Sequence, residues 1–159
     1  MLFEGEYLND HKWNGIGYDP KGNIIYELFN GNCKSEFKEY NHDGTIDFEG
    51  SCSNGLRNGK GKEYYFNRIF EGEYLNGLRN GKGKEYDKEG KLKFEGEYFC
   101  GLKHGNGKEY NKDGLLSFEG EYSNGVRNGK GKEYNEKGEL MYEGYYANSE
   151  KMIRTFIFH

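Results

Sequence analysis

The sequence holds little of what a compact globular protein usually needs. Only 33% of its 159 residues are hydrophobic, and it has one proline, one tryptophan and three cysteines. No apolar run approaches the roughly 20 residues of a membrane-spanning helix, so none is expected. Low hydrophobicity alone would indicate disorder, but 17% of the residues are aromatic and disordered chains are poor in aromatic residues. The composition therefore predicts a folded protein with a thin core.

Neither sign of charge dominates the sequence. The 23 basic and 27 acidic residues give a net charge of −4, whereas a general nucleic-acid binder carries a clear basic excess. No nucleic-acid partner is therefore expected. The cysteines Cys33, Cys52 and Cys100 are odd in number and widely spaced. No signal peptide is expected, because the first residues already match the repeat. These features favour a cytoplasmic location, in association with cytoskeleton or membrane, and predict no thiol chemistry.

Internal repetition is the dominant signal of the chain. The motif Phe-Glu-Gly-Glu-Tyr occurs three times, and looser copies bring the number of units to six full and one truncated. The units start near residues 3, 26, 48, 70, 94, 118 and 142. A second block, Gly-Lys-Gly-Lys-Glu-Tyr, follows the first in the regular units. Such a period indicates a repeat architecture in which each unit is one supersecondary element.

Each unit has the pattern of a β-hairpin. Apolar residues and glycine alternate with charged residues with a period of two, as in a strand with two different faces. The pairs Asn76-Gly77 and Asn80-Gly81 are turn signals, and 81–86 is the return strand. Strand glycines are expected to accept aromatic rings from neighbouring strands.

The predicted fold is all-β: an elongated, single-layer antiparallel ribbon of stacked β-hairpins. It forms one domain over residues 1–159, with about thirteen strands, and residues 147–159 serve as a C-terminal capping strand.

The repeated motifs resemble a known family. Phe-Glu-Gly-Glu-Tyr followed by Asn-Gly-x-Arg-Asn-Gly-Lys-Gly is similar to the MORN (membrane occupation and recognition nexus) repeat, and the resemblance covers nearly the whole chain. The family's usual unit has 23 residues, with Gly-x-Gly-x-Tyr on the return strand. Here the segment from Gly83 to Tyr86 has one extra residue, so either a bulge lies there or Tyr86 faces the other way.

No residue pattern points to catalysis. The four histidines have no His or Cys partner at metal-ligand spacing, no catalytic triad is found, and the segment 77–83 lacks the spacing of a phosphate-binding loop. The carboxylates repeat evenly beside lysines, which is typical of cross-strand pairing on a solvated face. We expect no catalytic residues, no metal site and no cofactor, and a protein that is not an enzyme.

Two surfaces are candidate binding sites. One sheet layer leaves its aromatic face only partly covered, and an exposed apolar strip usually marks an interface. Pure packing is the alternative for this face. A file of basic residues in the hairpin turns would line one edge and meet an anionic partner, or serve only solubility and local pairing. The aromatic candidates are Phe70, Tyr74, Phe94, Tyr98, Phe118, Tyr122 and Tyr146, and the basic edge is Arg57, Arg79, Lys103 and Arg127.

The resemblance implies a non-catalytic scaffold, because MORN-like proteins serve in cytoskeletal and ciliary assemblies and some bind a partner segment along the repeat groove. We expect protein partners that offer a helix or an extended segment to the aromatic face, and copies of the chain itself as partners in a homo-oligomer or larger assembly. The alternative is a membrane-associated binder of anionic phospholipid headgroups through the Arg/Lys edge. Interleaved glutamates oppose that contact, so weak or no membrane binding is expected.

Overall fold

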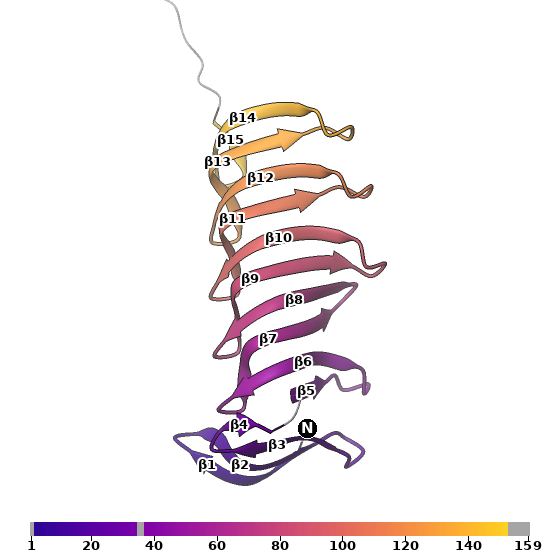
Figure 1. Ribbon diagram of the computed structural model, residues 1–159, viewed down its shortest axis with the longest axis vertical. Helices are drawn as coiled ribbons and strands as arrows, with labels where there is room; N and C mark the ends of the chain where they lie inside the picture. The colour runs from indigo at the N-terminus through magenta and orange to yellow at the C-terminus, as the bar shows by residue number, and fades with distance from the viewer. Residues whose placement is uncertain (1, 35–36, 153–159) are drawn as a thin grey trace, which may run out of the picture.

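The computed structural model describes residues 2–34 and 37–152. Over these residues it contains fifteen strands and no helix, which confirms the all-β prediction. Figure 1 shows the strands stacked along one long axis. The strands are β1 (Leu2–Leu8), β2 (His11–Tyr18), β3 (Ile24–Phe29), β4 (Asn32–Cys33), β5 (Phe37–Tyr40), β6 (Ile46–Ser53), β7 (Leu56–Tyr65), β8 (Arg68–Leu75), β9 (Leu78–Asp87), β10 (Leu92–Phe99), β11 (Leu102–Tyr110), β12 (Leu116–Ser123), β13 (Val126–Tyr134), β14 (Leu140–Ala147) and β15 (Glu150–Lys151).

All of these strands belong to one open antiparallel sheet, in which they follow one another in chain order except that β4 and β5 both pair with β6. Two more strands are found than the thirteen predicted, for two reasons. The seventh unit is a complete hairpin, because Glu150–Lys151 pairs with β14, and the return strand of the second unit is split into β4 and β5. The predicted capping strand thus begins in β15, and residues 153–159 lie outside the described residues.

Two-residue turns close the regular hairpins at one end: Asn-Gly in three of them and Cys100-Gly101 in the fourth. Asn76 and Gly77 both have positive φ, of 49° and 87°, which is the backbone of the tight hairpin turn that this dipeptide favours. The second predicted turn, Asn80-Gly81, is wrong. Gly81 lies inside β9 with φ of 98°, at a bulge where the backbone N–H of Lys82 donates to the Glu73 carboxylate. Glycine is needed there because the bulge requires a left-handed backbone.

Longer turns join most hairpins at the opposite end. In the turn after β9, the Asp87 carboxylate accepts hydrogen bonds from the backbone N–H groups of Glu89 and Lys91, each at 3.0 Å. Asp19, Asn111 and Asn135 act in the same way. The β7–β8 turn is shorter and places Phe66 at its tip, fully exposed and with φ of 50°.

The second unit departs from the pattern. Tyr26 pairs with Gly17 and Leu28 pairs with Cys33, so Tyr26 occupies a glycine position of the repeat and Leu28 occupies the position of Tyr74. This unit therefore runs two residues out of phase with the start near 26 that the sequence predicts. A further difference is the disulfide between Cys33 and Cys52. The expectation of no thiol chemistry was based on sequence spacing, and hairpin stacking brings these distant residues together.

The core is a column of rings along one face of the sheet. Phe70, Phe94 and Phe118 are almost completely buried, and each meets the tyrosine of the next unit edge-to-face. The centroids of Phe94 and Tyr122, for example, are 5.4 Å apart. A Cβ atom added to Gly107 would lie 2.7 Å from the Phe94 ring and 3.0 Å from the Tyr122 ring. The predicted packing of rings over strand glycines is confirmed.

Candidate functional site

The aromatic candidates form the core and do not form an exposed strip. All seven side chains, from Phe70 to Tyr146, are at most 4% exposed. The expectation that a single sheet layer leaves them partly covered is wrong, because side chains from the sheet itself close over the rings. The individual residues are Phe70, Tyr74, Phe94, Tyr98, Phe118, Tyr122 and Tyr146.

The basic edge supplies that cover. The Arg79 guanidinium lies 4.3 Å from the centre of the Phe70 ring, the Lys103 Nζ atom 3.8 Å from Phe94, and the Arg127 guanidinium 4.0 Å from Phe118. Arg57 covers Phe48 in the same way. The prediction of a basic edge that points towards an anionic partner is wrong, because these side chains fold inwards and stack on the core rings.

Carboxylates on the return strands bind both the tyrosines of the core and the basic side chains that cover the rings. Glu63 accepts hydrogen bonds from the Tyr74 hydroxyl at 3.0 Å and from Arg79 at 2.8 Å. Glu85, which is 5% exposed, accepts from Tyr98 at 2.9 Å and lies 3.5 Å from Lys103. Glu109 and Glu133 repeat the arrangement. Each unit is thus locked to the next by a Tyr–Glu–Arg/Lys network, and local pairing accounts for the basic file.

The contacts within this network shift the pKa values of its members. Burial raises the pKa of Glu63, but attraction and hydrogen bonding from Arg79 outweigh it, so the net pKa lies below the usual value for glutamate. Glu109 behaves alike, with Arg127 and Tyr122 as the opposing partners. Burial first, and then the negative charge of Glu85, raises the pKa of Tyr98. At neutral pH Glu63 and Glu109 are therefore charged and the Tyr98 hydroxyl is protonated.

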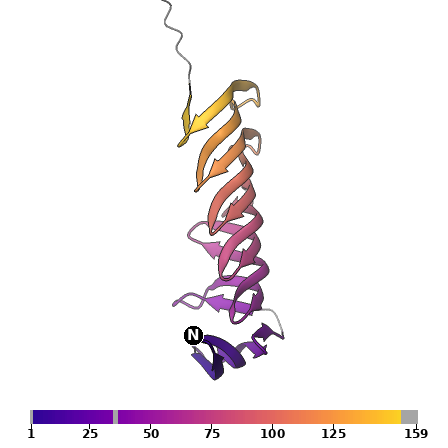
Figure 2. The ribbon, with the colours of Figure 1, turned by 90° about the vertical axis from the view of Figure 1, so that its left-hand side faces the viewer.

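A long groove occupies the opposite face of the sheet. Its floor is a row of glycines from nine consecutive strands, each paired with the next across the sheet. Eight interstrand steps of about 4.8 Å make the row roughly 40 Å long, and the groove encloses about 1390 Å³. Figure 2 shows the strands curling around the long axis. The floor residues are Gly50, Gly61, Gly72, Gly83, Gly96, Gly107, Gly120, Gly131 and Gly144.

Charged residues of both signs line the groove. Glutamates of the outgoing strands alternate with lysines of the return strands, as in the pairs Glu71–Lys84 and Glu95–Lys108. The lining contains seven glutamates and seven lysines, so it carries no net charge. Several ladder neighbours are ion-paired, among them Lys62 with Glu71 at 3.0 Å. These side chains are largely exposed, and such pairs contribute little to stability.

Tyrosines of the return strands flank the same face. The Tyr110 hydroxyl donates to the groove residue Glu95 at 2.7 Å, and Tyr64 and Tyr134 contact groove glutamates in the same way. Burial and the bond to Glu95 raise the pKa of Tyr110 to about 12. Tyr86 pairs with Leu92 beyond a register shift, which places it with these tyrosines. Of the two alternatives that the extra residue left open, the structure therefore has Tyr86 facing away from the aromatic core, and the register shift lies on the neighbouring strand, between Leu92 and Phe94.

An apolar rim borders the groove near the two-residue turns. Leu75 and Leu78 face each other across one hairpin, and Phe99 and Leu102 across the next. All four are about half exposed. Leu75 follows Glu73 by two residues on the same strand, and Phe99 follows Glu97 likewise, so the rim lies on the groove face. Sequence reasoning missed this rim, although a hydrophobic residue directly before the turn in two units was its signal.

Two specific features are absent from the described part of the chain, a metal-ligand group and a membrane-spanning helix. Within residues 2–34 and 37–152, no three His, Cys, Asp or Glu side chains are grouped so that they could hold a metal ion. Over the same residues, no helix has the length and apolar character to cross a membrane.

Comparison with known proteins addresses the repeats. The family model of the MORN repeat matches residues 48–68, 70–91, 94–115 and 118–139, which together make up more than half of the chain. The four matches coincide with the units that build the groove. A search of curated proteins returns no match to this chain.

Proposed function

Because the chain belongs to the MORN repeat family, whose repeats are in general non-enzymatic modules for interaction with proteins or membranes, we propose that it is a non-catalytic scaffold that holds a helical segment of a partner protein in its groove. The observation that carries the proposal is the glycine-floored groove of about 1390 Å³. A concave site of this size that runs along the sheet suits an elongated occupant.

The backbone of the groove favours a helix over an extended strand. An extended peptide gains affinity by hydrogen bonding to a free sheet edge. Every strand from β6 to β13 already pairs with a neighbour on each side, so the floor offers no free edge. A helix satisfies its own backbone groups and needs only side-chain contacts from the groove.

The charge pattern also suits a helix. Like charges recur every second strand, at about 9.6 Å, and seven helical residues rise about 10.5 Å. A helix with oppositely charged residues every seventh position would meet successive lysines such as Lys84 and Lys108. Its apolar stripe would contact the rim of Leu75, Leu78, Phe99 and Leu102.

The balance of charge argues against a lipid surface as the occupant. Anionic membranes attract clusters of basic residues, whereas the groove lining carries seven lysines against seven glutamates. The basic side chains of the edge are already paired with Glu63, Glu85 and Glu109. We therefore propose weak or no membrane binding, and the cytoplasm as the location.

Site-specific photo-crosslinking tests the proposal. A photoreactive residue at Lys84 or Lys108 should capture one partner segment, whereas the same residue at the turn positions Lys88 or Lys112 should not. A synthetic peptide of the captured segment should gain helical circular dichroism when it binds. Capture of equal strength at the turn positions, or binding without any helical signal, would contradict the proposal.

Charge reversal provides an independent measurement. Lys84→Glu with Lys108→Glu should weaken binding of that peptide at least tenfold, because two carboxylate partners on the helix lose their lysines. Lys88→Glu with Lys112→Glu changes the net charge equally outside the groove and is the matched control. The groove variant should melt somewhat lower than the control, because its new carboxylates lie opposite Glu71, Glu95 and Glu119. Binding is therefore compared at a temperature at which both proteins are folded. An equal loss of affinity in both would indicate a non-specific charge effect.

A further inference from the structure

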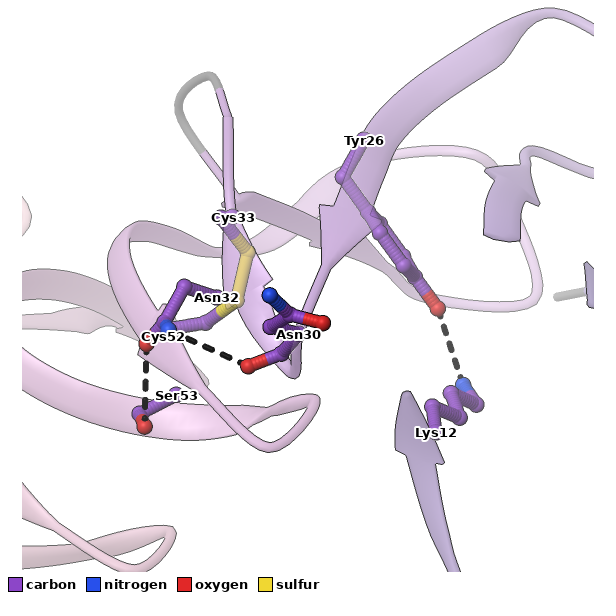
Figure 3. The surroundings of a disulfide bond; sticks show 7 residues. All are labelled: Lys12, Tyr26, Asn30, Asn32, Cys33, Cys52 and Ser53. Atoms are coloured by element: carbon purple, nitrogen blue, oxygen red, sulfur yellow. Dashed lines mark hydrogen bonds between the residues drawn. A yellow bond between two sulfur atoms is a disulfide. The ribbon is translucent and has the colours of Figure 1, made fainter. Parts of the chain in front are cut away.

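The disulfide links β4 to β6, the adjacent strands of the sheet that share the fewest backbone pairs. The following strand, β5, forms four further pairs with β6. Cys33 ends β4 and Cys52 lies in β6 (Figure 3). These two strands share one backbone pair, Asn32 with Ser53, whereas neighbouring strands of the regular array share five or more. The other backbone contact across the junction is the Gly55 N–H to the Gly31 carbonyl, at 3.3 Å.

The two cysteines replace the residues that lock the other units together. Cys52 pairs with Arg57 in the register in which Tyr74 pairs with Arg79, so Cys52 stands at the tyrosine position. Cys33 pairs with Leu28 in the same register and so stands at the position of Arg79. At this junction the Arg57–Glu39 ion pair of the network remains, at 2.7 Å, but the Tyr–Glu hydrogen bond is missing. A covalent bond instead joins the tyrosine position of one unit to the arginine position of the preceding unit.

We propose that the Cys33–Cys52 pair is a redox-controlled joint between the N-terminal units, residues 2–33, and the regular array. A dithiol reductant supplies two electrons and two protons, the sulfur–sulfur bond breaks to give two thiols, and the reductant becomes a disulfide. With the bond open, the junction retains the Asn32–Ser53 pair and ring contacts such as Tyr26 with Phe37, at 4.9 Å. The N-terminal units then move more freely relative to the array.

Because of where the disulfide lies, breaking it should affect only the N-terminal end of the sheet. The groove begins at Glu49 and Gly50, so its floor lies on the array side of the joint. Opening the joint should therefore leave the array intact. In a reducing cytoplasm the two thiols prevail, and an oxidising state closes the joint.

Hydrogen exchange in defined redox buffers tests the proposal. In oxidised dithiothreitol, which does not accumulate mixed disulfides with exposed thiols, the folded protein should show one reactive thiol, Cys100, and in reduced dithiothreitol it should show three. Amides in 24–33 and 37–53 should exchange at least tenfold faster in the reduced protein, while those in 94–146 stay unchanged. Three thiols in the oxidising buffer, or equal exchange in both buffers, would overturn the joint.

Variants separate the bond from its side chains. Cys33→Ser with Cys52→Ser should exchange rapidly in both buffers, and Cys100→Ser should behave as the unmodified protein. Cys33→Arg with Cys52→Tyr rebuilds the repeat network around Glu39, which occupies the position of Glu63, and should exchange slowly in both buffers. Redox-dependent exchange that persists in this variant would refute the assignment, and the result stands even if the serine variant does not fold.

Discussion

Replacing Glu85 with alanine probes the network that joins the units. Glu85 is almost fully buried, accepts a hydrogen bond from the Tyr98 hydroxyl at 2.9 Å, and lies 3.5 Å from both Arg79 and Lys103. Without its carboxylate, Tyr98 keeps a buried hydroxyl with no acceptor and Lys103 loses the carboxylate beside it. Arg79 is affected less, because it still contacts Glu63 at 2.7 Å.

The loss of stability caused by Glu85→Ala can be derived from these contacts. A hydrogen bond to a charged group contributes about 1.5–3 kcal/mol, and removal of one partner of a buried ion pair costs about 3–5 kcal/mol. Lys103 is partly exposed, so its share is smaller because water screens it. We expect Glu85→Ala to lower the free energy of unfolding by about 3–4 kcal/mol.

The measurement is urea unfolding at neutral pH, combined with hydrogen exchange of the β9, β10 and β11 segments. The control is Glu89→Ala in the adjoining turn, where the carboxylate is exposed and faces Lys91 at 3.6 Å. Its loss should be below about 0.5 kcal/mol. If both variants lose the same free energy, or if Glu85→Ala leaves exchange in these strands unchanged, the network does not hold the units together.

Three further changes test the same account. Lys103→Arg should raise the free energy of unfolding by about 0.5–1 kcal/mol, because a guanidinium can bridge two carboxylates as Arg79 does. The increase should appear as a higher urea midpoint, and an unchanged midpoint would count against it. Gly107→Ala should cost about 1–3 kcal/mol by calorimetry, because its Cβ would meet two core rings. The pH profile of the melting temperature should fall at both ends. The lowered pKa of Glu63 makes its contribution complete above about pH 4.5, the usual value for glutamate, and the contribution is lost below that value, as the pH falls through the lowered pKa. The raised pKa of Tyr98 makes its contribution complete below about pH 10 and lost above it. A flat profile from pH 3 to 11 would contradict both assignments.

The strands and their order were predictable because the signals are local. Alternation of side chains around Phe94 and Tyr98 determines which residues share a face, and Asn76-Gly77 has the backbone preferences of a tight turn. The Asn80-Gly81 pair carries the same signal but forms a bulge. What distinguishes the two is the Glu73 carboxylate across the strand, which accepts a hydrogen bond next to Gly81, and a dipeptide pattern does not contain that information.

The identity of the buried face was not predictable from periodicity. Alternation places Phe70 and Tyr74 together, but it does not reveal what covers them. The cover comes from Arg79 on the next strand and Glu63 from the preceding unit, and their phase depends on the bulge at Gly81. The Cys33–Cys52 bond was missed for a related reason: its partners meet only when the shifted register of the second unit is known.

The two faces of the ribbon bear different constraints, and this division explains how a regular array can be specific. On the core face, exchange of a phenylalanine, tyrosine or buried glutamate disturbs the packing of neighbouring units. On the groove face the side chains are solvated and contribute little to stability, so their chemistry is free to vary. The chain already shows such variation: Asn106 stands where its preceding unit has Lys82, and Tyr145 stands where its preceding unit has Glu121. These breaks interrupt a charge ladder that would otherwise be the same in every unit, and they leave the rings beneath undisturbed.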